Sequence, residues 1–273
     1  GLTLKSVGRI TVSTSGASAG SPRLIGTAGG PITFWTTGPT GGVTLGNFTQ
    51  LNTTQASSSG ADITIGGGTA LTGDASRPSG PAASDVEHGI QLGTTVNSSV
   101  FVVRAGTGSF SAVGSYTGTA TTAKAGIWLP PGQDINAGII SLDGTTTYNQ
   151  NDDITSSIDA YFSGSTATSL IHATSSFAVS GDSIRITGSS ASNTGLSLGP
   201  NINNPNPMTI RASGQNAGIS ITGTTSNLSA SSGLWIAGVQ LQTANGPVSL
   251  NSGARPIGPV SYTHLRAHET VLD

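Results

Sequence analysis

The sequence has no cysteine and very little charge. Its 273 residues include 10 Lys and Arg and 12 Asp and Glu, with a formal net charge of −2. No basic run supplies the Lys and Arg clusters that neutralise phosphates, which argues against nucleic acid as a partner. No stretch approaches the roughly 20 apolar residues that span a bilayer. We therefore expect no membrane insertion by this piece.

The lack of Cys fits either a reducing cytosol or a long exported chain that stays unfolded while it crosses a membrane. Sparse charge and abundant Ser, Thr and Asn favour export. The chain begins without Met or a signal segment. We expect a piece of a longer protein that is truncated at both ends, with any signal upstream.

Helical periodicity is also missing, and 40 Gly interrupt most windows. Short β signals are present instead, each made of two aliphatic residues around one small or polar residue. Such alternation puts both aliphatic side chains on one face of a strand. These doublets occur at Ile63–Ile65, Ile90–Leu92, Ile127–Leu129, Ile184–Ile186, Leu196–Leu198, Ile219–Ile221, Leu234–Ile236, Val239–Leu241 and Val248–Leu250.

A strand with two inward aliphatic residues cannot stay folded alone, because burying each contributes only about 1.5–3 kcal/mol against the cost of ordering the backbone. Many such strands must stack, which favours an all-β parallel β-helix, or β-solenoid. The spacing predicts roughly 20–30 residues per turn and a rod of roughly 45–60 Å. The alternative is a β-sandwich or tandem immunoglobulin-like domains, whose strands usually run longer.

Three segments break this rhythm and predict loops or a small excursion from the rod. Residues 66–88 are rich in Gly, Ser and Pro, and residues 199–207 read GPNINNPNP. Residues 145–171 carry Tyr and clustered Asp. Whether residues 145–176 form a coil or an excursion is open.

The stretch 214–253, GQNAGISITGTTSNLSASSGLWIAGVQLQTANGPVSLNSG, resembles the filamentous-haemagglutinin-like large exoproteins of Gram-negative bacteria. The shared pattern is a G-I-x-L unit joined by turns of Thr, Ser and Asn, as at 126–129 and 138–144. The resemblance covers most of residues 1–258 and is weakest at 66–88 and 145–176. It implies a right-handed parallel β-helix, exported by two-partner secretion through an outer-membrane transporter or as an autotransporter passenger.

Membership in this family implies an adhesin-type scaffold, extracellular or on the outer cell surface, without enzyme activity. Its partners would be a host-cell surface, a glycan or the extracellular matrix. Three alternatives are a β-helix polysaccharide-degrading enzyme or phage tailspike, a surface-layer protein and an ice-binding solenoid. The sparse charges argue against the enzyme, and irregularly placed Thr residues argue against ice binding.

Residues 259–273 differ sharply from the rest in charge and in their His content. Back-translated, they resemble a transposase end and adapter of sequencing libraries. We therefore expect residues 1–258 to be the β-solenoid region and residues 259–273 to be a non-native tail that packs against nothing. His264, His268 and Glu269 are excluded as metal ligands for the same reason.

A few polar groups invite a chemical interpretation. Asp152, Asp153 and Asp159 could form a carboxylate pair or calcium site, but adjacent residues on a strand point to opposite faces. The segment 85–88, with Asp85, Glu87 and His88, lacks a recognisable frame of metal ligands. Gly66–Gly68 lacks the tandem Asp of calcium-binding β-rolls.

His172 fits an ordinary strand residue. We expect no catalytic residues, no metal and no cofactor. Two tryptophans are candidate contact residues. Trp128 and Trp235 each lie between two aliphatic residues, so alternation points them outward. An outward Trp on a rod could bind sugar or a partner. The alternative is that an adjacent loop covers it.

Overall fold

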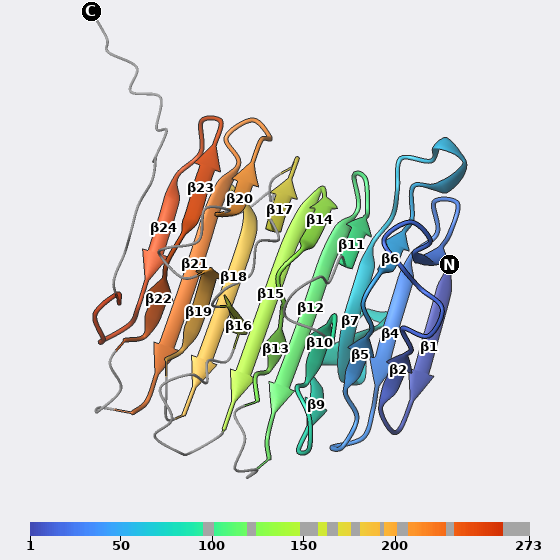
Figure 1. Cartoon of the computed structure of the whole chain (residues 1–273), viewed down its shortest axis with the longest axis horizontal. Helices are drawn as coiled ribbons and strands as arrows, with labels where there is room; N and C mark the ends of the chain where they lie inside the picture. The colour runs from blue at the N-terminus through green and yellow to red at the C-terminus, as the bar shows by residue number, and fades with distance from the viewer. Residues whose placement is uncertain are drawn as a thin grey trace, which may run out of the picture.

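The computed structural model describes residues 1–94, 101–118, 124–147, 158–162, 169–175, 181–191, 194–200, 207–227 and 232–258. In these ranges the chain winds through three parallel sheets in turn, and each circuit of the three makes one coil. Figure 1 shows the strands of successive coils side by side in chain order, from β1 to β24. The all-β parallel β-helix is confirmed; its handedness stays a prediction.

The ten-stranded sheet, here sheet 1, contains β1 (Leu2–Ser6), β4 (Ile32–Thr36), β7 (Ile63–Leu71), β12 (Ser109–Tyr116), β15 (Ile139–Thr146), β18 (Asp182–Ser190), β21 (Gly218–Thr225) and β24 (Val248–Asn251), with β8 (Asp74–Gly80) and β9 (Ala82–Ser84) off this path.

Sheet 2 contains β2 (Ile10–Val12), β5 (Val43–Leu45), β10 (Ile90–Leu92), β13 (Ile127–Trp128), β16 (Ile158–Phe162), β19 (Leu196–Pro200) and β22 (Leu234–Ile236). Sheet 3 contains β3 (Arg23–Gly26), β6 (Thr49–Asn52), β11 (Phe101–Arg104), β14 (Gln133–Ala137), β17 (Ser169–Ala173), β20 (Met208–Ala212) and β23 (Val239–Thr243). A 3₁₀ turn, η1 (Gln55–Ser57), follows β6.

The aliphatic doublets form the core, as the alternation predicts. Ile219 and Ile221 are both fully buried, and the members of the other doublets are at most 3% exposed up to β23. In-register pairing stacks these residues coil upon coil, as when Ile184 pairs with Ile219. The doublet of β24 is only partly buried, because in the described ranges β24 pairs with β21 alone.

Some coils match the length that the sequence spacing predicts, and others are longer. Ile32 pairs with Ile63, and Ile63 pairs with Phe110, so one coil takes about 30 residues and the next about 47. Three strands, their corner turns and inserted segments account for this length. Eight strands on the main path of sheet 1 span roughly 34 Å at a strand spacing of about 4.8 Å. The predicted length of 45–60 Å was too large.

Glycines line the corner between sheets 1 and 2, where the chain has no room for a side chain. A Cβ on Gly223 in β21 would lie 2.4 Å from the carbonyl oxygen of Gly233. A Cβ on Gly126, just before β13, would lie 2.5 Å from the carbonyl oxygen of Thr145. The Gly that opens the unit at 126–129 therefore lies at this tight corner, whereas Gly138, which opens the unit at 138–144, lies between β14 and β15 at the corner of sheets 3 and 1.

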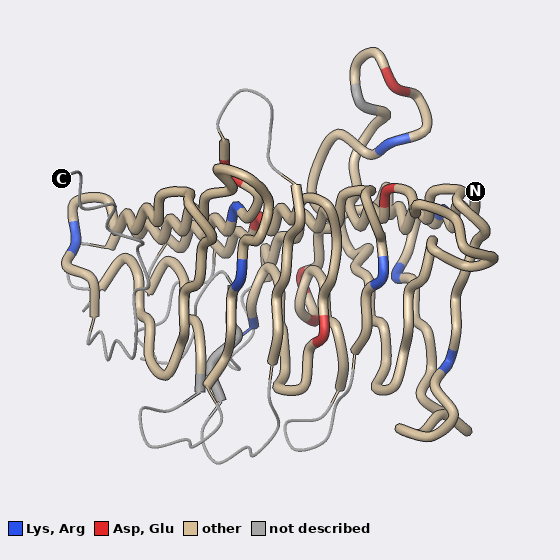
Figure 2. The backbone as a smooth tube through the Cα atoms, turned by 90° about the horizontal axis from the view of Figure 1, so that it is seen from above, with Lys and Arg blue, Asp and Glu red and all other residues tan. Residues whose placement is uncertain are grey.

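The predicted excursion at 66–88 is a hairpin inserted into one strand of sheet 1. β7 turns back as β8, the one antiparallel strand pair in the described part, and β9 then returns to pair with β12. The base of the hairpin lies over β4, all of whose residues are buried. Its tip stands away from the stack of coils (Figure 2). The predicted excursion is thus confirmed for the hairpin, and at β9 the chain is back in sheet 1.

The other two irregular segments have different outcomes. Within 145–171, β16 and β17 occupy regular coil positions in sheets 2 and 3, so these strands belong to coils, a question that the sequence left open. A single large aliphatic residue in Ile158–Ala160 weakened the doublet signal there. Gly199 and Pro200 end β19. Residues 201–206 and the tail at 259–273 lie outside the described residues, so the tail stays a prediction.

Within the described ranges, no helix has the length and apolar character needed to cross a membrane.

Candidate functional site

Sheet 3 carries a row of polar side chains on its outer face. The inward residues of its strands are aliphatic, as in Ile135, Ile171 and Ile210, and the residue after each points outward. In-register pairing aligns these outward residues across six coils. We call them the polar row: Asn52, Arg104, Asn136, His172, Arg211 and Gln242.

Arg104 forms an ion pair with a carboxylate in the next coil. Its guanidinium donates to both carboxylate oxygens of Asp134, which lies in the neighbouring outward column. It also donates to the backbone carbonyl of Asp134 at 3.0 Å. Both side chains are more than one-third exposed, so water screens the pair. This part of the row is therefore electrically balanced.

His172 links three coils by hydrogen bonds. Its Nδ1 lies 3.3 Å from Asn136 Nδ2 and its Nε2 lies 2.8 Å from Ser213 Oγ. An amide nitrogen is a donor, so Nδ1 accepts and Nε2 carries the proton. Burial lowers the pKa of His172, the nearby Arg211 lowers it further, and Asp134 opposes both effects. The imidazole is thereby held neutral near pH 7.

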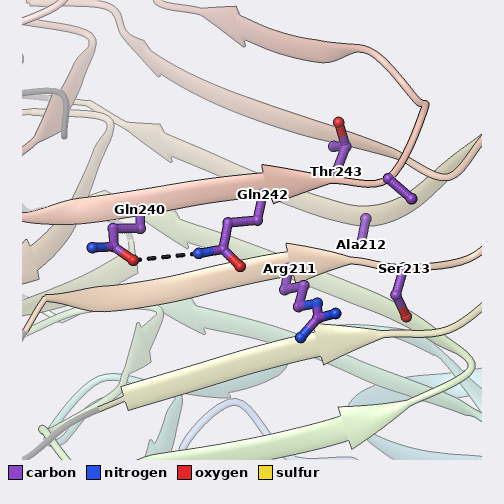
Figure 3. A pocket seen from close by; sticks show the side chains of 7 residues that line it. Arg211, Ala212, Ser213, Gln240, Gln242 and Thr243 are labelled. Atoms are coloured by element: carbon purple, nitrogen blue, oxygen red, sulfur yellow. Dashed lines mark hydrogen bonds between the residues drawn. The ribbon is translucent and has the colours of Figure 1, made fainter. Parts of the chain in front are cut away.

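The row ends in a groove of about 370 Å³ between β20 and β23. Arg211, Ser213 and Gln242 line it, together with Gln240 and Thr243 (Figure 3). Gln242 donates from Nε2 to Gln240 Oε1 at 3.3 Å. Arg211 is exposed, and no hydrogen bond or ion pair to it occurs among the described residues. The groove thus offers one uncompensated positive charge beside several amide and hydroxyl groups.

A second polar cluster clasps the first three coils where sheet 1 turns into sheet 2. Arg9, which precedes β2, donates to Thr44 Oγ1 at 2.7 Å and to Ser84 Oγ at 2.8 Å. Burial lowers the pKa of Arg9, while Glu87 and Asp85 oppose that effect. The cluster is a structural clasp, because its donors are occupied by protein acceptors.

The segment 85–88 continues this clasp. Glu87 forms an ion pair with Lys124 at 2.6 Å. His88 Nδ1 accepts from the backbone N–H of Ala125 at 2.9 Å. Burial lowers the pKa of His88 to about 3, and Lys124 contributes to the shift. Within the described ranges no group of three or more His, Asp or Glu is arranged to hold a metal ion.

The two candidate tryptophans are half-buried on the outer face of sheet 2. Trp128 stacks on His88, with ring centroids 5.3 Å apart and an interplanar angle of 11°. Trp235 lies against the segment at Gly258, where an added Cβ would approach its Cδ1 to 2.7 Å. Each ring is therefore partly covered by neighbouring chain. Contact with a partner stays a prediction.

The remaining candidates do not meet at one place. Asp152 and Asp153 lie outside the described residues, and Asp159 lies in β16. Gly66 and Gly67 belong to β7, where they approach the base of the hairpin. His172 is the one residue singled out in the sequence that belongs to the polar row.

Sequence reasoning missed the other five members of the row. A signal exists in Leu51-Asn52, Val103-Arg104, Ile135-Asn136, Ile171-His172, Ile210-Arg211 and Leu241-Gln242, where an aliphatic residue precedes a planar, nitrogen-bearing side chain. The unequal coil lengths hide this repeat until the register is known.

Comparison with known proteins adds no relative, since no family model, no curated protein and no solved structure matches this chain.

Proposed function

We propose that this chain is part of an exported surface or secreted scaffold of the adhesin type, from a Gram-negative bacterium. The observation that carries this proposal is the unbroken polar row of sheet 3. It runs across six coils on a rigid aliphatic core, and so offers a long surface with repeated, individually weak hydrogen-bonding groups. Extended binding surfaces of this kind are a general property of repeat proteins.

The distribution of charge favours binding over catalysis. Catalysis by side chains needs ionisable groups that converge in a pocket with pKa values suited to proton transfer. His88, the described group with the largest pKa shift, has its Nδ1 bound to a backbone amide and its ring face against Trp128. His172 is likewise held by Asn136 and Ser213. We propose that the chain has no enzyme activity.

Export by two-partner secretion or as an autotransporter passenger, through an outer-membrane transporter, completes the proposal. The supporting observations are the lack of Cys and the resemblance of residues 214–253 to large exoproteins. The place of action would be extracellular or on the outer cell surface, with a host-cell surface, a glycan or the extracellular matrix as partner.

The direct test expresses residues 1–258 and measures binding to host cells, matrix proteins and glycan arrays, with hydrolysis of pectin and bacterial polysaccharides assayed in parallel. Saturable binding without release of oligosaccharide is expected. Release of oligosaccharide would replace the scaffold with a polysaccharide-degrading enzyme. Self-assembly into a two-dimensional lattice, without binding to any surface, would favour a surface-layer protein.

A further inference from the structure

We infer that the polar row and its groove bind a linear glycan that carries carboxylates, laid along the axis of the solenoid. This inference rests on the proposed function and deepens it, because it names the binding face and the class of ligand. Three observations carry the inference: the register of sheet 3, the groove between β20 and β23, and the charge of Arg211, which no carboxylate of the described residues neutralises.

The spacing of the row suits an extended sugar chain. Adjacent members sit on hydrogen-bonded strands, so they repeat every 4.8 Å or so along the axis. This is close to the length that one pyranose ring occupies in an extended chain. A ligand with one sugar per coil would therefore meet an equivalent donor or acceptor at each step.

The chemistry of the row suits sugar hydroxyls and carboxylates. Amide groups donate and accept, as hydroxyls do, and a planar guanidinium can donate two parallel hydrogen bonds to one carboxylate. His172 adds a neutral ring whose neighbours fix its orientation. Arg104 and His172 also lose little freedom on binding, because hydrogen bonds to adjacent coils already hold them.

The distribution of charge places the carboxylate at Arg211. Asp134 neutralises Arg104, whereas Arg211 faces the groove without a carboxylate partner among the described residues. With a net charge of −2 the whole chain does not attract polyanions in general. Selectivity for an acidic glycan therefore depends on this one guanidinium and on the Gln and Ser groups around it.

Two other hollows suit an acidic glycan less well. One, on sheet 1, is lined by Arg77 and Arg185 but also by the carboxylate of Asp62, whereas the lining of the groove at Arg211 holds no carboxylate. A second hollow is lined by Thr145, Ser189, Thr224 and neighbouring small residues. It offers small hydroxyl groups and no charge among its lining residues, so it lacks the charged donor that gives the groove at Arg211 its selectivity.

The test measures binding of residues 1–258 to oligogalacturonates of two and six residues and to neutral cellohexaose by calorimetry. The acidic hexamer is expected to bind at least about tenfold more tightly than the acidic dimer and than cellohexaose, since contacts add from coil to coil. R211Q should weaken binding of the acidic hexamer about tenfold or more, as expected for a lost charge-assisted contact.

R185Q is the matched control, because it removes the same charge from sheet 1 and leaves sheet 3 intact. It should change binding of the acidic hexamer by less than about twofold. Equal losses in R185Q and R211Q, equal affinity for the dimer and hexamer, or no binding of the acidic hexamer would each overturn the inference. Far-ultraviolet circular dichroism confirms that both variants are folded.

The same two variants separate this inference from the proposed function. If cells or matrix bind the wild type and R211Q equally while the oligogalacturonates do not bind, the glycan site is wrong and the adhesin proposal stands. If the wild type binds no surface and no glycan, both are wrong. Loss of cell binding in R211Q alone, together with loss of the acidic hexamer, supports both.

Discussion

The first coils and the last coils of this solenoid share one core but are held together differently. In the first three coils, side chains cross between strands: Arg9 spans three coils, and the base of the hairpin covers Trp35. From β15 onward, the outer face of sheet 1 carries partly exposed Ser and Thr together with Asp143 and Arg185. Among these later coils, His172 crosses between coils on the open face of sheet 3, and the aliphatic column and glycine corners are the repeated elements. The stack is thus held by buried side-chain clasps in its first coils and by repetition with more exposed crossings in its later ones.

The largest effect should come from Trp35→Ala in the covered coils. Trp35 is 3% exposed, and its Nε1 donates to Gly68 O at 2.9 Å. Its loss should lower the free energy of unfolding by about 3–5 kcal/mol, measured by urea denaturation. Trp35→Phe keeps an aromatic ring and removes the donor, so it should lose much less, with about 1 kcal/mol from the hydrogen bond.

Hydrogen exchange locates this loss. Faster exchange confined to β4, β7 and the hairpin would support a local clasp. Equal acceleration in β21 and β22 would contradict the division into two kinds of coil.

Gly223→Ala should destabilise the later coils, around β21 and β22, instead. The new Cβ would lie 2.4 Å from the carbonyl oxygen of Gly233, and backbone cannot give way there without moving two strands. A loss of about 2–3 kcal/mol is expected, with faster exchange in β21 and β22. Gly8→Ala is the control, because its Cβ would meet nothing within 4 Å; it should change stability by less than about 0.5 kcal/mol. Similar losses in the two variants would disprove the steric argument.

Acid should destabilise the first coils, which contain the clasp at Arg9 and residues 85–88, before it destabilises the later coils. The pKa of His88 is about 3 in the folded chain and near 6.5 when unfolded, so the unfolded state binds more protons between these values. Stability is then complete above pH 6.5 and falls as the pH drops toward 3. The pKa of Glu87 is also lowered, chiefly by its hydrogen bond with Lys124. Protonation of Glu87 below the ordinary pKa of a glutamate therefore also lowers the stability of the folded chain.

We expect a loss of about 2 kcal/mol between pH 7 and pH 4, after allowing for partial exposure of the ring. The measurement is the urea midpoint as a function of pH. His88→Gln should make the urea midpoint depend less on pH, whether or not the variant is less stable than the wild type at pH 7. An unchanged slope in this variant would assign the acid sensitivity to other groups.

The smallest effect is expected for Arg104→Gln, which removes a coil-crossing ion pair on an open face. Because both partners are more than one-third exposed, the loss should be about 0.2–1 kcal/mol and should shrink as salt is added. A loss of stability as large as that of Trp35→Ala would show that an exposed contact between coils stabilises the solenoid as much as a buried one. Urea denaturation at low and high salt distinguishes these results.

The inward residues were predictable from the sequence because alternation is a local property of the strand. Ile219 and Ile221, for example, point inward whatever the coil length. The length of a coil is not local, since it depends on turns and insertions that carry no period. This is why the predicted rod was too long and why the sequence left residues 145–176 open between a coil and an excursion.

The candidate site was harder to predict for the same reason. His172 and Arg211 are adjacent in space but almost forty positions apart in sequence, and the next interval is shorter. Only the register brings such residues into one row. The covering of Trp35 was equally hidden, because it depends on where the hairpin folds back.

The hairpin shows that the length of the chain and the height of the rod are separate quantities in a solenoid. It leaves sheet 1 after Gly67, and the chain resumes the same sheet at β9, beside the next residues of β12. Inserted residues therefore add no height to the rod, because reach increases only when another coil is added. Evolution can lengthen such a chain to add new surface to a rod of fixed height, or add coils to make the rod taller while each coil keeps the same surface.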